Sequence, residues 1–452
     1  MNTTMKDFID NSMQRQIADL QELVRIPSVS RGDPRPGMPL GEQVAHALRY
    51  TLNLARRLGF TKVWDLDGYC GIVEYGEGEE CLGIMAHLDV VPEGTGWTYP
   101  PYGAEIHNGR MYGRGTVDDK GAAVSALYAL AAVKDCKIPL KRRVRLILGC
   151  DEERGWACME HYKRFEEEPT LAFTPDAEYP VVHSEMGIMQ AAYFNPTPVR
   201  FISEVGTAPN VIPGEATVSL LGITSPQVLP EGYTLEYSFN QVKVTGKGGH
   251  ASMPELGLNA LQGLLCFIRL HHDLSNEEQA LADGLFDMFK FDLHGESLGI
   301  DVTDDSGRTT CVPSMFTANE SGVSITIDCR YPFSLSEREM LLRLDTAFGS
   351  RGFVRKHYKN TDCHFVPADS ELVTALMEIF NRNAKVNAEP MKIGGGTYAR
   401  AFKNAVAFGT VPYLEESPCH MPDESVGLSD IRFNTVVIAE AIERLAGAEA
   451  AK

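Results

Sequence analysis

The sequence lacks any long apolar segment free of charge. In the first thirty residues, apolar side chains recur at helical spacing and are interrupted by charged ones, and no run of about 18 uncharged apolar residues occurs anywhere. A signal peptide requires an uninterrupted apolar core, and a transmembrane helix requires a longer one. We therefore expect neither a signal peptide nor a membrane span.

Positive charge is also scarce. The chain has 42 Lys and Arg residues against 61 Asp and Glu residues, which gives a net charge of -19. Phosphate-rich surfaces repel such a protein, so we expect neither a nucleic acid nor a membrane as a partner. The absence of a basic cluster also argues against a metallophosphatase.

None of the ten cysteines forms a C-x-x-C pair. Closely spaced pairs are typical of zinc ribbons and redox motifs, and disulfides are typical of exported proteins. We therefore expect free thiols and a cytoplasmic location.

What remains is the composition of a globular protein with more than one domain: 452 residues, 44% of them hydrophobic and 23% charged. Strand-like and helix-like segments alternate over the first 180 residues, which predicts an α/β fold with a mostly parallel sheet flanked by helices. From about residue 190, two strand–turn–helix units predict an inserted α+β domain. The predicted boundaries are 1–187 and 367–452 for the first domain and 188–366 for the insert.

The stretch "MAHLDVVPEG" ends an apolar strand with His87 and Asp89. Residues i and i+2 of a strand point to the same side, so Asp89 can accept a hydrogen bond from the imidazole and fix which ring nitrogen faces outward. This is the usual support of a metal-bound histidine, and open α/β sheets place their ligands at such strand ends. Taken by itself, however, the pair is more typical of a surface loop.

Four further segments carry acids or a histidine at strand ends or in loops. They are "GRGTVDDKG" with Asp118 and Asp119, "GCDEERG" with Asp151, Glu152 and Glu153, "TPDAEYP" with Asp176, and "SPCHMPDE" with His420. One aspartate would suffice to cap a helix, and three adjacent acids repel one another unless a cation or a proton compensates. Imidazole and carboxylate suit zinc, manganese or cobalt, so we expect two divalent metal ions, in the first instance zinc. Water held between them would be the nucleophile, with an unligated carboxylate as its proton acceptor.

In this order, the five motifs resemble the dinuclear zinc peptidase family of carboxypeptidase G, the desuccinylases and carnosinase. The stretches "HLDVVPEGTGW", "PDAEYP" and "GGGTYAR" are most similar to the PepV-type dipeptidases of that family. The resemblance extends from about Ile26 to the C-terminal helix, so it covers nearly the whole chain.

The resemblance implies a metal ligand in each motif. His87 and Asp176 would hold one metal, Glu153 and His420 would hold the other, and Asp118 would bridge both.

It also implies two residues that act beside the metals. Glu152 would be the general base and acid, and Asp89 would orient His87. The peptide bond between Asp118 and Asp119 would be cis.

The insert would be the lid of this family. Its segment "VTGKGGHASMP" makes His250 the candidate for stabilising the oxyanion, with an ordinary turn histidine as the alternative. Asn210 in "APNVIPGEA" and Arg330 in "DCRYPFS" would contact substrate, since the arginine fork suits a carboxylate. The alternatives are a turn cap for Asn210 and a surface salt bridge for Arg330.

The glycines of "GGGTYAR" let the backbone approach a ligand closely. The N–H groups around Gly395, together with Thr397 or Tyr398, would hold the terminal carboxylate of a substrate. Arg400 would assist or would brace the loop.

These features predict a cytoplasmic, metal-dependent hydrolase that cleaves the amide bond of dipeptides. An N-acyl-amino-acid deacylase or desuccinylase shares all the metal ligands and is the alternative. A binding protein that kept the metals is a third interpretation, but it would have no need of Glu152 as a proton acceptor. In the large PepV-type lid one chain supplies what a dimer partner supplies elsewhere, which predicts a monomer.

Overall fold

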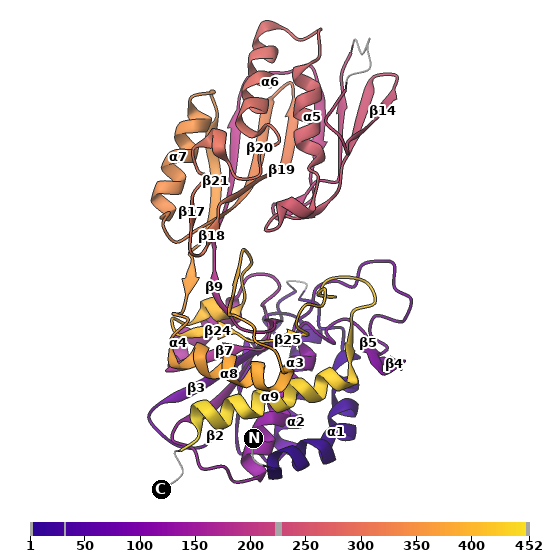
Figure 1. Cartoon of the computed structure of the whole chain (residues 1–452). Coiled ribbons are helices and arrows are strands. Elements are labelled where there is room, and N and C mark those ends of the chain that lie inside the picture. Colours follow the sequence, from indigo (N-terminus) through magenta and orange to yellow (C-terminus); the bar gives the residue numbers. More distant parts are fainter. Residues whose placement is uncertain (1–2, 31–32, 222–227, 449–452) are drawn as a thin grey trace. The chain divides into compact units, whose positions relative to one another are not determined.

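The chain folds as two units, shown in the computed structural model of Figure 1, which describes residues 3–30, 33–221 and 228–448. The first unit comprises Met1–His183, Phe365–Met391 and Gly396–Lys452, and the second comprises Ser184–His364 and Lys392–Gly395. The predicted breaks after residues 187 and 366 lie near these transitions, whereas the return of Lys392–Gly395 to the second unit was not predicted. Within the described ranges, no helix combines the length and the apolar character needed to cross a bilayer.

The first unit is built on one mixed sheet. Its strand order is β1 (Lys62–Leu66), β2 (Cys70–Tyr75), β6 (Arg143–Gly149), β3 (Cys81–His87), β7 (Leu171–Thr174), β24 (Ala405–Ala407), β9 (Val182–Glu185) and β22 (His364–Phe365), with β23 (Met391–Ile393) beside β9. The central strands β6, β3, β7 and β24 pair in parallel, whereas β1, β2 and β6 pair antiparallel. The antiparallel margin was not predicted; β1 and β2 are joined by only three residues, a connection too short for a parallel crossover.

Helices cover both faces of this sheet. They are α1 (Thr3–Val24), α2 (Glu42–Arg57), α3 (Lys120–Asp135), α4 (Ala157–Phe165), α8 (Glu371–Ala384) and α9 (Leu428–Ala446). Smaller pairings complete the unit: β8 (Ala177–Glu178) with β25 (Thr410–Val411), and β26 (Ser425–Gly427) with β5 (Arg110–Tyr112) and β4 (Glu105–His107).

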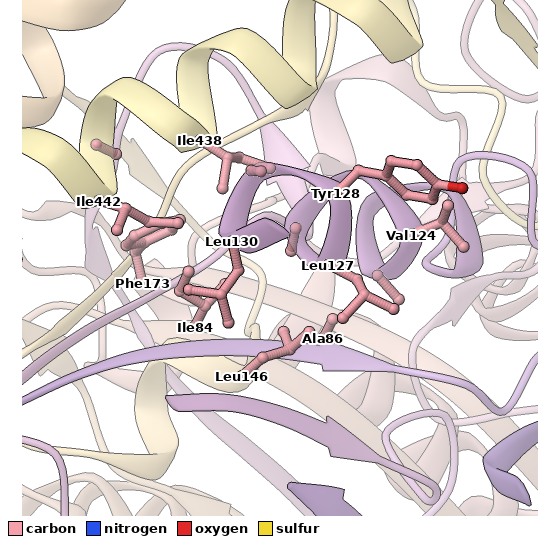
Figure 2. Close-up of a cluster of buried hydrophobic side chains, with 14 of the residues drawn as sticks. Ile84, Ala86, Val124, Leu127, Tyr128, Leu130, Leu146, Phe173, Ile438 and Ile442 are labelled. Carbon is pink, nitrogen blue, oxygen red and sulfur yellow. The ribbon is translucent and has the colours of Figure 1, made fainter. Parts of the chain in front are cut away.

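Helix α3 lies between the sheet and α9, and its Ala- and Leu-rich surface is buried on all sides (Figure 2). Ile84 and Ala86 of β3 belong to this cluster, whereas Met85 belongs to a second cluster on the opposite face of the sheet. The alternation explains why β3 reads as an unbroken apolar run, since both of its faces are covered. By the same alternation His87 faces the side of Met85, where its ring meets Tyr398 edge-on at 6.0 Å.

Parallel pairing also brings the chemistry-bearing ends of the strands together. Strand β3 ends at His87, β6 ends at Gly149 just before Glu152, and β7 ends at Thr174 just before Asp176. These three strands are neighbours with a common direction, so their carboxyl ends share one edge of the sheet.

The second unit is an antiparallel sheet covered by helices. Its strand order is β14 (Thr234–Ser238), β15 (Gln241–Thr245), β13 (Glu215–Ser219), β11 (Ile202–Val205), β19 (Thr310–Asn319), β20 (Gly322–Tyr331), β10 (Gly187–Asn195) and β21 (Val354–Thr361). Helices α5 (Ala260–Arg269), α6 (Asn276–Phe289) and α7 (Glu337–Gly349) share one hydrophobic core with it. The predicted class, an α/β domain with an inserted α+β domain, is confirmed.

Candidate metal centre

His87 is held from both sides of its ring. Its side chain is fully buried, with Nδ1 2.9 Å from the carbonyl oxygen of Asp89 and Nε2 2.9 Å from Oδ1 of Asp118. A carbonyl only accepts, so Nδ1 carries the proton and Nε2 is the nitrogen that faces the other acids. The expected carboxylate contact from Asp89 is replaced by its carbonyl, since the nearest carboxylate oxygen is 3.6 Å away.

The carboxylate of Asp89 instead organises the turn after β6. It accepts the backbone N–H of Glu152 and that of Glu153, each at 3.1 Å. Asp89 therefore fixes the predicted base and a predicted ligand as well as His87.

Asp118 lies between the two histidines. Its Oδ1 is 2.9 Å from Nε2 of His87 and its Oδ2 is 3.1 Å from Nε2 of His420. The peptide bond between Asp118 and Asp119 is cis, as expected from the resemblance. The two oxygens of one carboxylate thus face two different imidazoles, which is the arrangement of a bridging ligand.

The other two predicted ligands complete the same cluster. Oδ2 of Asp176 is 3.5 Å from Nε2 of His87, and Oε1 of Glu153 is 3.2 Å from Nε2 of His420. The structure therefore gathers all five predicted metal ligands into one site. His420 differs from the rest, because its side chain is 55% exposed and its backbone has a φ of 65° in a loop.

The cluster contains more acid than base, and its pKa values reflect this. Burial raises the pKa of Glu152 well above its usual value, and the charges of Asp176 and Glu153 raise it further. Hydrogen bonds with Asp118 and Glu153 raise the pKa of His420 to about 11. Without a cation, protons must therefore relieve the mutual repulsion of the carboxylates.

The residues present fit divalent metal ions. Two groups of residues that share His87 each bring their donor atoms within 4.8 Å of one another. The first group is His87, Asp118 and Glu153, and the second is His87, Asp119 and Asp176. Oδ1 of Asp119 is buried, and no residue in the described ranges hydrogen-bonds it. An imidazole among carboxylates is a donor set for zinc, manganese or cobalt.

Asp119 was not predicted to contribute a donor atom. Its Oδ2 accepts the backbone N–H of His87 at 3.0 Å, so it also anchors the end of β3. Glu424 and Arg114, which join the surrounding loops, were missed as well. Arg114 lies in "GRGTVDDKG" and Glu424 lies in "SPCHMPDE", and the sequence could have drawn attention to both. In "SPCHMPDE", however, only His420 was given a role.

The substrate residues predicted on the second unit are placed in two different settings. Asn210 and His250 are exposed neighbours, joined by the backbone pairing of β12 (Val211–Ile212) with β16 (Gly249–His250). Arg330 is 3% exposed, and Asp328 binds its Nε and Nη2 at 2.7 and 3.1 Å. The fork predicted to bind a substrate carboxylate is therefore already occupied, and its Nη1 donates to the carbonyl of Gly394 at 2.7 Å.

The glycine-rich segment is also arranged differently from the prediction. Tyr398 is fully buried, and its hydroxyl lies 2.9 Å from Sγ of Cys158. Its ring fills the space above Gly149, where an added Cβ would lie 2.3 Å from the hydroxyl oxygen. Tyr398 is thus a packing residue and does not present its hydroxyl to a ligand. Gly395 is half-buried, and Thr397 caps a short 3-10 helix by accepting the N–H of Ala399 at 3.2 Å.

Comparison with known proteins gives this geometry a family. Residues 83–444 match the model of Peptidase family M20/M25/M40. The chain is 35% identical over 453 residues to YtjP of Bacillus subtilis (strain 168), which carries a provisional dipeptidase name, covering 95% of this chain and 97% of that protein. It is 30% identical over 468 residues to the Beta-Ala-Xaa dipeptidase of Lactobacillus delbrueckii subsp. lactis, and the match covers 98% of this chain and 99% of that protein.

Solved structures show the same fold. Human carnosine dipeptidase 1 superposes with a TM-score of 0.58 at 15% identity, covering 98% of each chain. The dipeptidase Dug1p of Saccharomyces cerevisiae superposes with a TM-score of 0.60 at 12% identity, again covering 98% of each chain. Together with the whole-length relatives, these matches confirm the predicted resemblance. It follows that this chain belongs to Peptidase family M20/M25/M40 and is a metallopeptidase.

Proposed function

We propose that the chain is a dipeptidase that hydrolyses the amide bond of short peptides at a two-metal centre. The position of Asp118 between His87 and His420 carries the proposal, because one carboxylate facing two imidazoles is suited to bridge two ions. The relatives named as dipeptidases match over nearly the full chain, which supports dipeptides over longer substrates.

His87 and Asp176 would hold one ion, Glu153 and His420 would hold the other, and Asp118 would contact both. Bound divalent ions supply Lewis acidity and lower the pKa of water toward neutrality from about 15.7 in bulk. Zinc is the proposed metal, with manganese and cobalt as alternatives that the same donors accept.

Glu152 is proposed as the proton carrier. It lies beside Asp118, Glu153 and Asp176 in the cluster but is not one of the predicted metal ligands. Burial raises its pKa. A carboxylate with a raised pKa is a stronger base, so it can take a proton from the attacking water and return it to the leaving amine. Asp89 holds its backbone in place for that transfer.

The second unit would act as a lid that contributes His250 to oxyanion stabilisation and Asn210 to substrate binding. The imidazole of His250 is exposed, and its Nδ1 is fixed 2.7 Å from Oγ of Ser252. Backbone groups at Gly395 and Thr397 are proposed to bind the substrate carboxylate. We further propose that the protein is a cytoplasmic monomer, which a sizing measurement tests for the oligomeric state.

A substrate panel tests the proposal against its alternative. Purified protein loaded with zinc, manganese or cobalt is assayed on dipeptides, including β-alanyl ones, and on N-acetyl and N-succinyl amino acids. Turnover of dipeptides with kcat/KM at least tenfold above that of the acylated amino acids is the expected result. Preference for the acylated amino acids would establish a deacylase instead, and turnover of neither class would refute both.

A further inference from the structure

Glu424 lies four residues after His420 and is fully buried. Its Oε1 accepts three backbone N–H groups, from Gly115 at 3.0 Å, Val117 at 2.9 Å and Asp118 at 3.2 Å. The carboxylate therefore sits inside the loop that delivers Asp118 and fixes the backbone of that residue directly.

The second oxygen of Glu424 faces Arg114, which is also buried. Oε2 accepts Nη1 of Arg114 at 2.7 Å, and the same nitrogen lies 3.3 Å from the carbonyl oxygen of Met421. Nη2 lies 3.4 Å from the carbonyl oxygen of Glu93, in the loop that follows His87 and Asp89. One buried ion pair thus joins the three loops that carry or follow His87, Asp118 and His420.

The predicted ligands depend on this pair to different degrees. His87 is the last residue of β3, and Asp176 lies between β7 and β8, so the sheet itself holds both. His420 has no such support, since it sits in the loop between β25 and β26 with an exposed side chain. Glu424, at the entry to β26, is the buried residue that ties this loop to Arg114 and to the loop of Asp118.

Burying an ion pair is a poor way to gain stability, because the desolvation of both charges offsets most of their attraction. What the pair does provide is orientation, since the four donors around the carboxylate of Glu424 hold it in one position. Supporting hydrogen bonds of this kind commonly tune metal affinity by about 10–100-fold.

We propose that Glu424, held by Arg114, is a positioning residue that sets the affinity of the ion on the His420 side. This inference rests on the proposed two-metal function. It assigns the two ions different dependence on Glu424: both share Asp118, but the ion held by His87 and Asp176 keeps two ligands that the sheet supports, whereas the ion held by Glu153 and His420 relies on a loop that Arg114 and Glu424 anchor.

The test is Glu424→Gln, which keeps the size of the side chain but turns an N–H₂ group toward either Arg114 or the loop N–H groups. Metal-free protein is titrated with zinc against a chromophoric chelator, and with cobalt(II) while the visible absorption is followed. Wild type is expected to bind two equivalents. The variant is expected to bind one equivalent normally and the second about 10–100-fold more weakly.

Glu74→Gln is the matched control. Glu74 pairs with Arg145 on β2 and β6, the two side chains are 9% and 6% exposed, and the pair lies away from the ends of the strands that carry the ligands. Both variants are expected to lower the Tm, but only Glu424→Gln is expected to change metal binding.

Two equivalents bound by Glu424→Gln as tightly as by wild type would overturn the inference and leave the proposed function intact. Failure of wild type itself to bind two ions or hydrolyse any amide would remove the proposed function instead. If Glu424→Gln does not fold, Arg114→Lys carries the test, because it keeps the charge but loses the fork that reaches Met421 and Glu93. If Arg114→Lys then binds the second equivalent of metal as tightly as wild type does, the inference is contradicted.

Discussion

The carboxylate of Asp89 accepts the backbone N–H of Glu152 at 3.1 Å. The same carboxylate accepts the N–H of Glu153 at 3.1 Å, and the carbonyl of Asp89 holds His87 at 2.9 Å. A fully buried residue thereby fixes the proposed base and one predicted ligand of each metal.

Asp89→Asn should reduce kcat/KM by about 10–100-fold, because the amide has only one oxygen to accept two N–H groups. Steady-state kinetics on the best dipeptide measure the loss. Asp151→Asn serves as control, since Asp151 accepts one N–H, from Ala157 at 3.0 Å, and one acceptor survives in the amide. Equal losses in the two variants would contradict the special role of Asp89.

Glu152→Gln should lower kcat by about 10²–10⁴-fold while two equivalents of metal stay bound. The amide cannot carry a proton between water and the leaving amine, but it removes no predicted ligand. Metal analysis of the same preparation separates the two effects. Unchanged turnover on every amide tested would exclude Glu152 as the proton carrier.

Chelation should abolish activity and lower the Tm, and zinc, manganese or cobalt should restore both. Removal of the ions leaves Asp118, Glu153 and Asp176 in mutual repulsion, which the raised pKa of His420 only partly relieves. Calorimetry and assays before and after dialysis measure the change, with mock-dialysed protein as the control. Full activity in a preparation shown by elemental analysis to be metal-free would contradict the prediction.

Tyr398→Phe should leave KM for dipeptides unchanged and cost about 1 kcal/mol of stability, because the hydroxyl only meets Cys158 in the core. Tyr128→Phe is a comparison within the same unit, since its buried hydroxyl donates to Asp19 at 2.6 Å. Both variants should lower the Tm without altering kinetics. A large rise in KM for Tyr398→Phe alone would restore this residue to the substrate site.

Glu278→Gln should destabilise the second unit by about 1–2 kcal/mol near neutral pH, since Glu278 completes the capping box of α6 with Ser275 and binds Arg200. Burial opposes the charge of Glu278, but the hydrogen bonds from Arg200 and Ser275 prevail and lower its pKa to about 2 from 4.5. Stability from a lowered pKa is complete above the unfolded value and is lost as pH falls toward the folded value.

The difference in Tm between wild type and Glu278→Gln should therefore be constant from pH 6 to 8 and shrink below pH 4.5. Glu277→Gln, an exposed neighbour in the same turn, should show no such trend. A difference that grows on acidification would reverse the assigned sign.

Much of the site could be predicted from the sequence because several of its residues lie at or just after the ends of strands. Apolar runs that stop at His87, before Glu152 and before Asp176 predict adjacent parallel strands, and adjacent parallel strands share a carboxyl edge. His420 had no such periodicity: the sequence marked it only as a histidine in a loop, and the motif resemblance supplied its role as a metal ligand.

What escaped prediction depends on contacts between distant segments. A short polar motif does not reveal that Arg330 is taken by Asp328, or that the hydroxyl of Tyr398 points to Cys158. The linkage of Glu424 to Arg114 spans 310 positions, so neither residue signals its partner. The antiparallel β1 and β2 likewise depend on a three-residue connection whose length matters more than its composition.

The chain passes between its two units at residues 183, 364, 391 and 395. The short segment Lys392–Gly395 supplies two carbonyl groups to the second unit. The buried Arg330 donates to the carbonyl of Gly394, and the carbonyl of Ile393 accepts the N–H of Met186 at 2.9 Å. A recombinant fragment of residues 184–364 would lack both the carbonyl that accepts Nη1 of Arg330 and the carbonyl that accepts the N–H of Met186. The second unit is therefore not one continuous stretch of sequence, and exchanging it between relatives requires that Lys392–Gly395 be exchanged together with residues 184–364.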